Sequence, residues 1–203
     1  MKRSKRIAVT AVGLALIILF GLMPISFGSA TIALTLLPVL VLALTQDFKT
    51  AAAGGLFMGL VSLIGAFTTG AGNPTAPLFR NPLVSILPRI LAPVAARAVQ
   101  RLCLAIAGAK GRPDKNRPGK AAKLAIDAFA SAVGVVTNTA TVLGMIWLLY
   151  GGKTVGDSAI TPEFMMGMIS INFVIEIIAF TLLTPPVVYA VTAREGRSDA
   201  SGD

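Results

Sequence analysis

The sequence contains no histidine and only one cysteine. Without histidine, the chain cannot form a Ser-His-Asp triad or an H-E-x-x-H metal site. The single cysteine, Cys103, excludes an internal disulfide bond. Cys103 lies in an apolar run, where a buried and inert thiol is the expected state. These absences remove several common catalytic classes.

Charge is also scarce, because only 13% of the residues are charged while 55% are hydrophobic. Soluble domains have about 25% charged residues and about 45–50% apolar residues. The polar residues are too few to cover a water-soluble particle of 203 residues. The composition therefore predicts an all-α integral membrane protein, with residues 1–203 forming a single membrane domain.

Six apolar segments are long enough to cross the roughly 30 Å hydrocarbon core of a bilayer. A cleaved signal peptide is the alternative for the first segment, but that segment lacks a convincing A-x-A cleavage site. The predicted fold is a bundle of six transmembrane helices. Their expected ranges are 7–26, 29–46, 49–68, 83–108, 121–150 and 163–192.

Basic residues gather on one side of such a six-helix bundle. They lie at residues 2–6, in a linker at 109–123 and in a polar tail at 193–203, whereas the opposite loops hold only Arg80 and Lys153. The positive-inside rule then places both termini in the cytoplasm. The net charge of +9 is best explained by a face that touches anionic lipid, and no nucleic-acid partner is expected.

Four polar residues are predicted to lie at membrane depth, where each charged group costs at least about 2.5 kcal/mol. They are Arg89, Asn138, Asn172 and Glu176, and Asn172 precedes Glu176 by one helical turn. In one interpretation, Arg89 and Glu176 neutralise each other and the asparagines cross-link helices. In the other, these residues bind a polar ligand, and the planar guanidinium of Arg89 suits a carboxylate.

Small residues predict close contacts between helices. Ala11 and Ala15 form an A-x-x-x-A pair in the first span, and Gly54, Gly55 and Gly59 recur in the third. Packing within the bundle is sufficient to explain both patterns.

Prolines and a second charge cluster mark the later spans. Pro88 and Pro93 are expected to kink the fourth span, and Pro185 is expected to mark the end of the sixth. Arg97 lies at the inner end of the fourth span, where Asp127 of the fifth span is expected to pair with it or with the arginine one turn later.

Three blocks of the sequence resemble the substrate-binding S components of energy-coupling factor (ECF) transporters. They are ATIALTLLPVLVLALTQDFKTAAAGGLFMGLVSLIGAF, FRNPLVSILPRIL and TNTATVLGMIWLLYG, and they extend from Ala30 to Gly151. The resemblance implies a transport subunit of the bacterial plasma membrane, not an enzyme, that captures a water-soluble vitamin from outside. It needs no cofactor or metal of its own.

The resemblance also implies protein partners, namely one membrane-coupling subunit and two ATPase subunits. The chain itself contains no G-x-x-x-x-G-K-[ST] motif for ATP. In the family, A-x-x-x-A in the first helix contacts the coupling subunit, which assigns Ala11 and Ala15 to that role. The ligand site of the family lies toward the outer side, where Arg89, Asn138 and Asn172 are expected to converge.

The sequence does not identify one substrate. Arg89 favours a vitamin with a carboxylate, such as pantothenate, and the loop TTGAGNPTAPLF has Phe79 as its one aromatic residue, which argues against a large stacked ring. A stand-alone carrier or channel is the alternative function, although the two halves show no convincing internal repeat. A membrane enzyme is disfavoured because Glu176 and Asp127 are expected at different depths.

Overall fold

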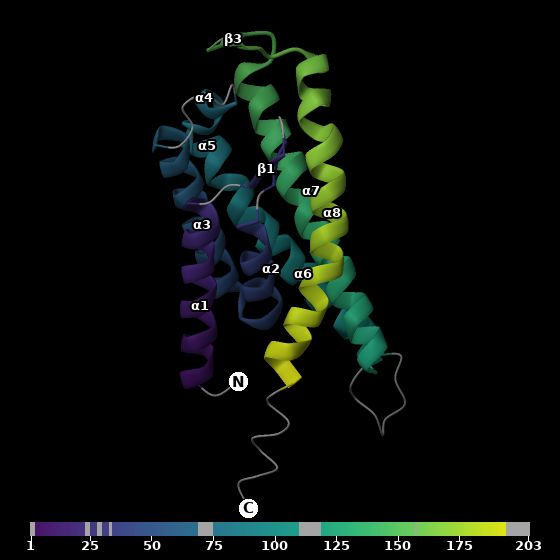
Figure 1. Ribbon diagram of the computed structural model, residues 1–203. Coiled ribbons are helices and arrows are strands. Elements are labelled where there is room, and N and C mark those ends of the chain that lie inside the picture. The colour runs from purple at the N-terminus through teal and green to yellow at the C-terminus, as the bar shows by residue number, and fades with distance from the viewer. Residues whose placement is uncertain are drawn as a thin grey trace, which may run out of the picture.

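The computed structural model describes residues 3–22, 25–27, 30–32, 34–68, 75–109, 119–156 and 158–193 (Figure 1). The long helices are α1 (Arg3–Leu22), α3 (Phe48–Thr68), α6 (Leu87–Ala109), α7 (Lys120–Tyr150) and α8 (Pro162–Ala193). The shorter helices are α2 (Leu36–Thr45), α4 (Ala76–Phe79) and α5 (Pro82–Ser85). Two antiparallel hairpins complete the described fold: β1 (Ile25–Phe27) with β2 (Ala30–Ile32), and β3 (Thr154–Val155) with β4 (Ser158–Ala159).

Five helical segments in the described part of the chain are long and apolar enough to cross a membrane. This confirms a mostly helical membrane protein, but it differs from the six expected spans. The segment expected at 29–46 forms a helix only over α2, which has 10 residues. Such a helix rises about 15 Å, half of what a bilayer requires.

The residues before α2 form the β1–β2 hairpin, so the expectation of an all-α chain is wrong for this segment. Backbone that is not helical is tolerated at membrane depth only where it is covered by protein or lines a cavity. Here the two strands pair with each other, Ser26 opposite Thr31, and β2 contacts α8. A hairpin signal was present in the sequence, because Gly28 and Ser29 separate two short β-prone segments.

The short helix α2 lies in the centre of the bundle and contacts α1, α3, α6, α7 and α8. Its apolar side chains are therefore buried on every side, and Leu36, Val39 and Leu40 are fully inaccessible. The same core continues into α1 and α8 through Ile17 and Phe180. Because protein rather than lipid surrounds α2, the helix need not match the thickness of the bilayer.

The glycines of α3 allow α6 to approach its backbone, as the small-residue pattern predicted. A Cβ at Gly55 would lie 2.2 Å from the carbonyl oxygen of Arg89, and one at Gly59 would lie 2.8 Å from the Cα of Ile86. Gly54 faces α2 instead, with Leu42 as its neighbour.

Proline has different effects in α6 and α8. The fourth apolar segment is interrupted at Ile86, between α5 and α6, two residues before Pro88. In α8, by contrast, Pro185 and Pro186 lie inside a helix that continues to Ala193, so the expectation that they end the helix is wrong. Neighbouring groups in a bundle can accommodate the missing backbone donors of such prolines.

The start of α1 and the end of α8 lie at the same end of the bundle, which is the lower end in Figure 1. This agrees with an even number of crossings if the hairpin and α2 together take the place of one span. Most of the expected linker at 109–123 and of the expected tail at 193–203 lies outside the described residues.

Candidate functional site

Three of the four expected ligand-binding residues are buried on three neighbouring helices. Arg89 belongs to α6, Asn138 to α7 and Glu176 to α8, and their exposed fractions are 7%, 6% and 6%. Helix α7 packs against both α6 and α8, which brings the three segments together. Asn172 belongs to α8, but its side chain lies outside the described residues.

The guanidinium of Arg89 is held by the irregular segment that precedes α6. Its Nη1 donates a hydrogen bond to the carbonyl oxygen of Val84 at 2.9 Å, and its Cζ lies 5.0 Å from the ring centroid of Phe79. A cation over an aromatic face at this distance is stabilised by the ring quadrupole. The hydroxyl of Ser85 donates to the carbonyl oxygen of Phe79 and thereby ties α5 to the end of α4.

The segment that carries Phe79 and Val84 is fixed by Asn81. The side chain of Asn81 accepts a hydrogen bond from the backbone N–H of Leu83 at 3.0 Å and so caps α5. Its amide also donates to the hydroxyl of Tyr150, at the end of α7, at 3.0 Å. These residues are not among the site residues predicted from the sequence, although Asn81 before Pro82 is a recognisable helix start.

Arg89 and Asn138 each retain a buried polar atom without a hydrogen-bond partner in the described part of the chain. These atoms are Nε of Arg89, a donor, and Oδ1 of Asn138, an acceptor. A buried polar group left without a partner costs about 1–3 kcal/mol, so such atoms are uncommon unless they serve a function. The charge of Glu176 attracts that of Arg89. Among the described residues, Arg89 thus keeps one unused donor atom and Asn138 one unused acceptor atom.

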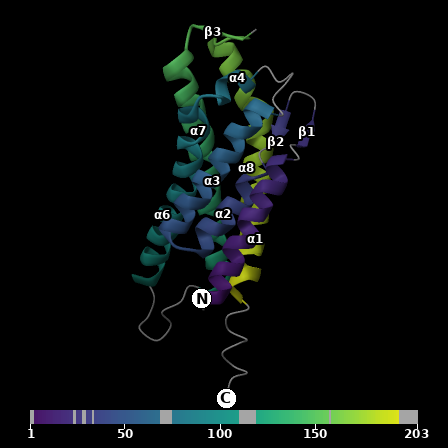
Figure 2. The same cartoon turned by 90° about the vertical axis from the view of Figure 1, so that its left-hand side faces the viewer.

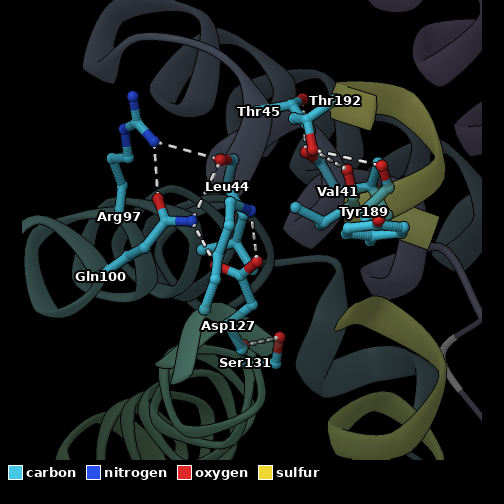
Figure 3. A network of polar contacts seen from close by, with 11 residues as sticks. Val41, Leu44, Thr45, Arg97, Gln100, Asp127, Ser131, Tyr189 and Thr192 are labelled. Atoms are coloured by element: carbon cyan, nitrogen blue, oxygen red, sulfur yellow. Dashed lines mark hydrogen bonds and ion pairs between the residues drawn. The ribbon is translucent and has the colours of Figure 1, made fainter. Parts of the chain in front are cut away.

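A separate network of polar contacts is shown in Figure 3. It lies near the start of α1, since Arg6 donates to Gln46 directly after α2. Gln100 accepts a hydrogen bond from Nη1 of Arg97 at 2.6 Å and donates to Oδ1 of Asp127 at 2.6 Å. Arg97 and Gln100 both also donate to the carbonyl oxygen of Leu44. The ion-pair partner of Asp127 is Lys123, at 2.8 Å, rather than an arginine of α6 as expected.

This network joins the end of α2 to α6 and α7. Arg97 and Gln100 supply donors to the carbonyl oxygen of Leu44 in the last turn of α2, where backbone carbonyl groups have no partner within the helix. The full burial of Asp127 indicates a structural role, and the network is distinct from the Arg89 site. No group of three or more His, Cys, Asp or Glu side chains in the described ranges could hold a metal ion.

Helix α1 lies on the outside of the bundle, against α2 and α3 (Figure 2). Only Gly13 and Ile17 of this helix are buried. Ala11 and Ala15 are exposed, and the larger apolar side chains next to them, Val12 and Leu19, are 60% and 50% exposed. The A-x-x-x-A pair is therefore not used for packing within the described bundle.

Comparison with known families supports the resemblance seen in the sequence. The family described as "ECF transporter, substrate-specific component" matches residues 5–188. The chain belongs to this family. S components are membrane transport subunits, so the chain is a multi-pass membrane protein with a transport function.

A solved structure of ThiT from Listeria monocytogenes has a similar fold. The TM-score is 0.60 at 17% sequence identity, and the alignment covers 94% of this S component and 96% of ThiT. At this identity the likeness bears on the fold alone. A comparison with curated protein sequences gave no match.

Proposed function

We propose that this S component captures a small, water-soluble nutrient with a carboxylate group, of which pantothenate is an example. The observation that supports the proposal is the buried guanidinium of Arg89, whose Nε has no acceptor among the described residues. A guanidinium can bind a carboxylate through two parallel, charge-assisted hydrogen bonds. Because Nη1 of Arg89 already donates to the carbonyl oxygen of Val84, Nε and Nη2 are the atoms proposed to hold the ligand.

Asn138 and Glu176 have complementary roles in this proposal. The orphaned Oδ1 of Asn138 accepts a hydrogen bond from an N–H or O–H group of the ligand. The charge of Glu176 offsets that of Arg89 when the site is empty. Asn172, one turn before Glu176 in α8, is proposed to add a further amide contact. Pantothenate carries hydroxyl and amide donors as well as the carboxylate and therefore suits this set.

The proposed partners are one membrane-coupling subunit and two ATPase subunits, which would drive release of the ligand to the cytoplasm. The exposed Ala11 and Ala15 support a contact between α1 and the coupling subunit, because small side chains let another helix approach closely. The basic end of the bundle, with the start of α1 and the end of α8, is proposed to face the cytoplasm.

Ligand identification tests the proposal most directly. The purified chain in detergent would be screened by thermal shift against B vitamins and their precursors, and any co-purified small molecule identified by mass spectrometry. A ligand at 100 times its Kd stabilises the folded state by about 2.7 kcal/mol, which is readily measured. A shift with pantothenate or another carboxylate compound is expected, and it should disappear when the carboxylate is replaced by a neutral amide. A ligand that tolerates that replacement would refute the role of Arg89.

Uptake into proteoliposomes tests the partners. Accumulation of the identified ligand should require the coupling subunit, the ATPases and ATP. Uptake by the S component alone would instead establish a stand-alone carrier.

A further inference from the structure

A cavity of about 280 Å³ opens at the basic end of the bundle, apart from the Arg89 site. Its lining includes three arginines, Arg6 of α1 and Arg97 and Arg101 of α6, and one acidic residue, Asp47. Thr192, near the end of α8, also lines it. The cavity thus lies where α1 starts, α2 ends and α8 ends. In a membrane-embedded bundle, this is the level at which lipid headgroups meet the protein.

The carboxylate of Asp47 is already engaged on both oxygens. Oδ2 binds Nη2 of Arg6 at 2.7 Å. Oδ1 accepts hydrogen bonds from Thr50, at 3.0 Å from the backbone N–H and 2.6 Å from the hydroxyl. Asp47 therefore neutralises Arg6 and caps the start of α3. Among the described residues, Arg97 and Arg101 of α6 have no direct ion pair at the cavity.

Arg97 and Arg101 supply a surplus of positive charge and of hydrogen-bond donors. Among the described residues, Nε of Arg97 is buried without an acceptor. The charge of Arg101 repels that of Arg97, while Asp47 and Asp127 attract it from a distance. Within the described ranges, Arg101 has a ring contact with Phe48 at 5.3 Å and no hydrogen-bond acceptor. An anion placed between the two guanidinium groups would satisfy both.

A second and larger cavity of about 730 Å³ shares Arg6 and Gln46 with the first. It extends along α1, and its lining includes the apolar side chains of Ile7, Ala11 and Leu14. The two cavities together combine a cationic pocket with an adjoining groove whose sides are partly apolar. Phospholipids with a negatively charged headgroup have this combination of chemistry.

We propose that the two cavities form a binding site for an anionic phospholipid. The phosphodiester lies between Arg97 and Arg101, and one acyl chain follows α1 past Ile7, Ala11 and Leu14. In the isolated subunit the lipid covers part of the face that carries Ala11. If α1 contacts the coupling subunit, as proposed above, the acyl chain must leave when that subunit docks. This consequence rests on the proposed function, whereas the lipid site itself does not.

Native mass spectrometry of the full chain in neutral detergent tests the site. Phosphatidylglycerol should remain bound about tenfold more tightly than phosphatidylcholine with the same acyl chains. Arg101→Gln should abolish this preference, since Arg101 makes no hydrogen bond to the described residues that its loss would break. The matched control is Arg80→Gln, which removes an arginine that contacts the ring of Phe67 and lies outside both cavities. This control should keep the preference.

Two further measurements separate a lipid from a free anion. Ala11→Trp narrows the groove and should weaken phosphatidylglycerol binding while Arg101 is intact. Inorganic phosphate at millimolar concentration should not displace the lipid. Equal binding of the two lipids, or a preference that survives Arg101→Gln, would overturn the proposal. So would full displacement by inorganic phosphate, which would identify a site for a free anion.

Discussion

Gly55 of α3 lies directly against the backbone of Arg89 in α6. A Cβ at Gly55 would stand 2.2 Å from the carbonyl oxygen of Arg89 and 2.9 Å from the Cα of Ile90. The contact sets how closely the two helices approach at the depth of the candidate ligand site. The position of the Arg89 guanidinium therefore depends on a residue that has no side chain.

Gly55→Ala should destabilise the protein by about 1–3 kcal/mol, because the added methyl group must push α6 away from α3. The displacement should also weaken ligand binding by moving Arg89. Gly144→Ala is the matched control, since no atom of the described residues lies within 4 Å of a Cβ at that glycine of α7. It should be neutral or stabilising by up to about 1 kcal/mol. Thermal unfolding of both variants in detergent checks the difference, and equal Tm values would contradict the close contact.

Arg89→Gln should lower the affinity for a carboxylate ligand by about tenfold to a hundredfold, because a charge-assisted hydrogen bond is worth about 1.5–3 kcal/mol. Titration calorimetry on the purified protein measures the loss. Arg80→Gln serves as the control, since Arg80 contacts the Phe67 ring and the carbonyl oxygen of Ala66 rather than the site. An unchanged Kd for Arg89→Gln would remove Arg89 from the site.

Asn138→Leu should have different effects on the stability of the empty protein and on its affinity for the ligand. Oδ1 of Asn138 is buried and has no donor among the described residues. Replacing the amide with an apolar side chain should therefore leave the empty protein as stable or raise its Tm. Ligand affinity should fall about threefold to tenfold, since one neutral hydrogen bond is lost. A drop in the Tm of the empty protein together with unchanged affinity would show that Asn138 has only a packing role.

Ala11→Trp combined with Ala15→Trp should prevent co-purification with the coupling subunit while ligand binding stays intact. Both alanines are exposed, so the indoles should not disturb the bundle itself. Leu148→Trp is the control, because Leu148 of α7 is 77% exposed on another helix. Pull-down of the complex measures the effect. If the complex survives both substitutions, the α1 contact is wrong.

Asp47 should make stability depend on acidic pH. The hydroxyl and backbone N–H of Thr50, together with Arg6, hold the pKa of the Asp47 carboxyl well below its usual range. Because the folded-state pKa lies below the unfolded value of about 3.9, the contribution is present above about pH 4 and is lost as the pH falls further. The side chain is 45% exposed, so screening by water keeps the effect small.

The comparison of wild type with Asp47→Asn tests this pH dependence. Asparagine can still cap α3 but cannot pair with Arg6. The wild type should have the higher Tm at pH 6, and the gap should begin to close below about pH 4. A gap that stays constant or widens toward pH 3 would contradict the assignment.

Composition and hydropathy were enough to identify lipid as the solvent of this protein, and three sequence blocks were enough to identify its family. Scarce charge and long apolar runs require lipid around the helices, and the blocks between Ala30 and Gly151 identified an S component, as the family match then confirmed. The burial of Arg89 and Glu176 also followed from their position in apolar segments. These properties can be read from composition and from patterns along the chain, without knowing which distant residues come into contact.

Long-range packing determines which secondary structure each apolar segment adopts. The segment 29–46 was predicted as one long helix, yet it contains strand β2 and the short helix α2. This is possible because α2 is surrounded by five other helices and need not reach both faces of the bilayer. Asp127 was expected to pair with an arginine, yet Lys123 lies one turn away and Gln100 relays the contact to Arg97. The orphaned atoms of Arg89 and Asn138 likewise become visible only in the folded chain. Such features depend on which residues distant in sequence meet, and a pattern along one chain does not contain that information.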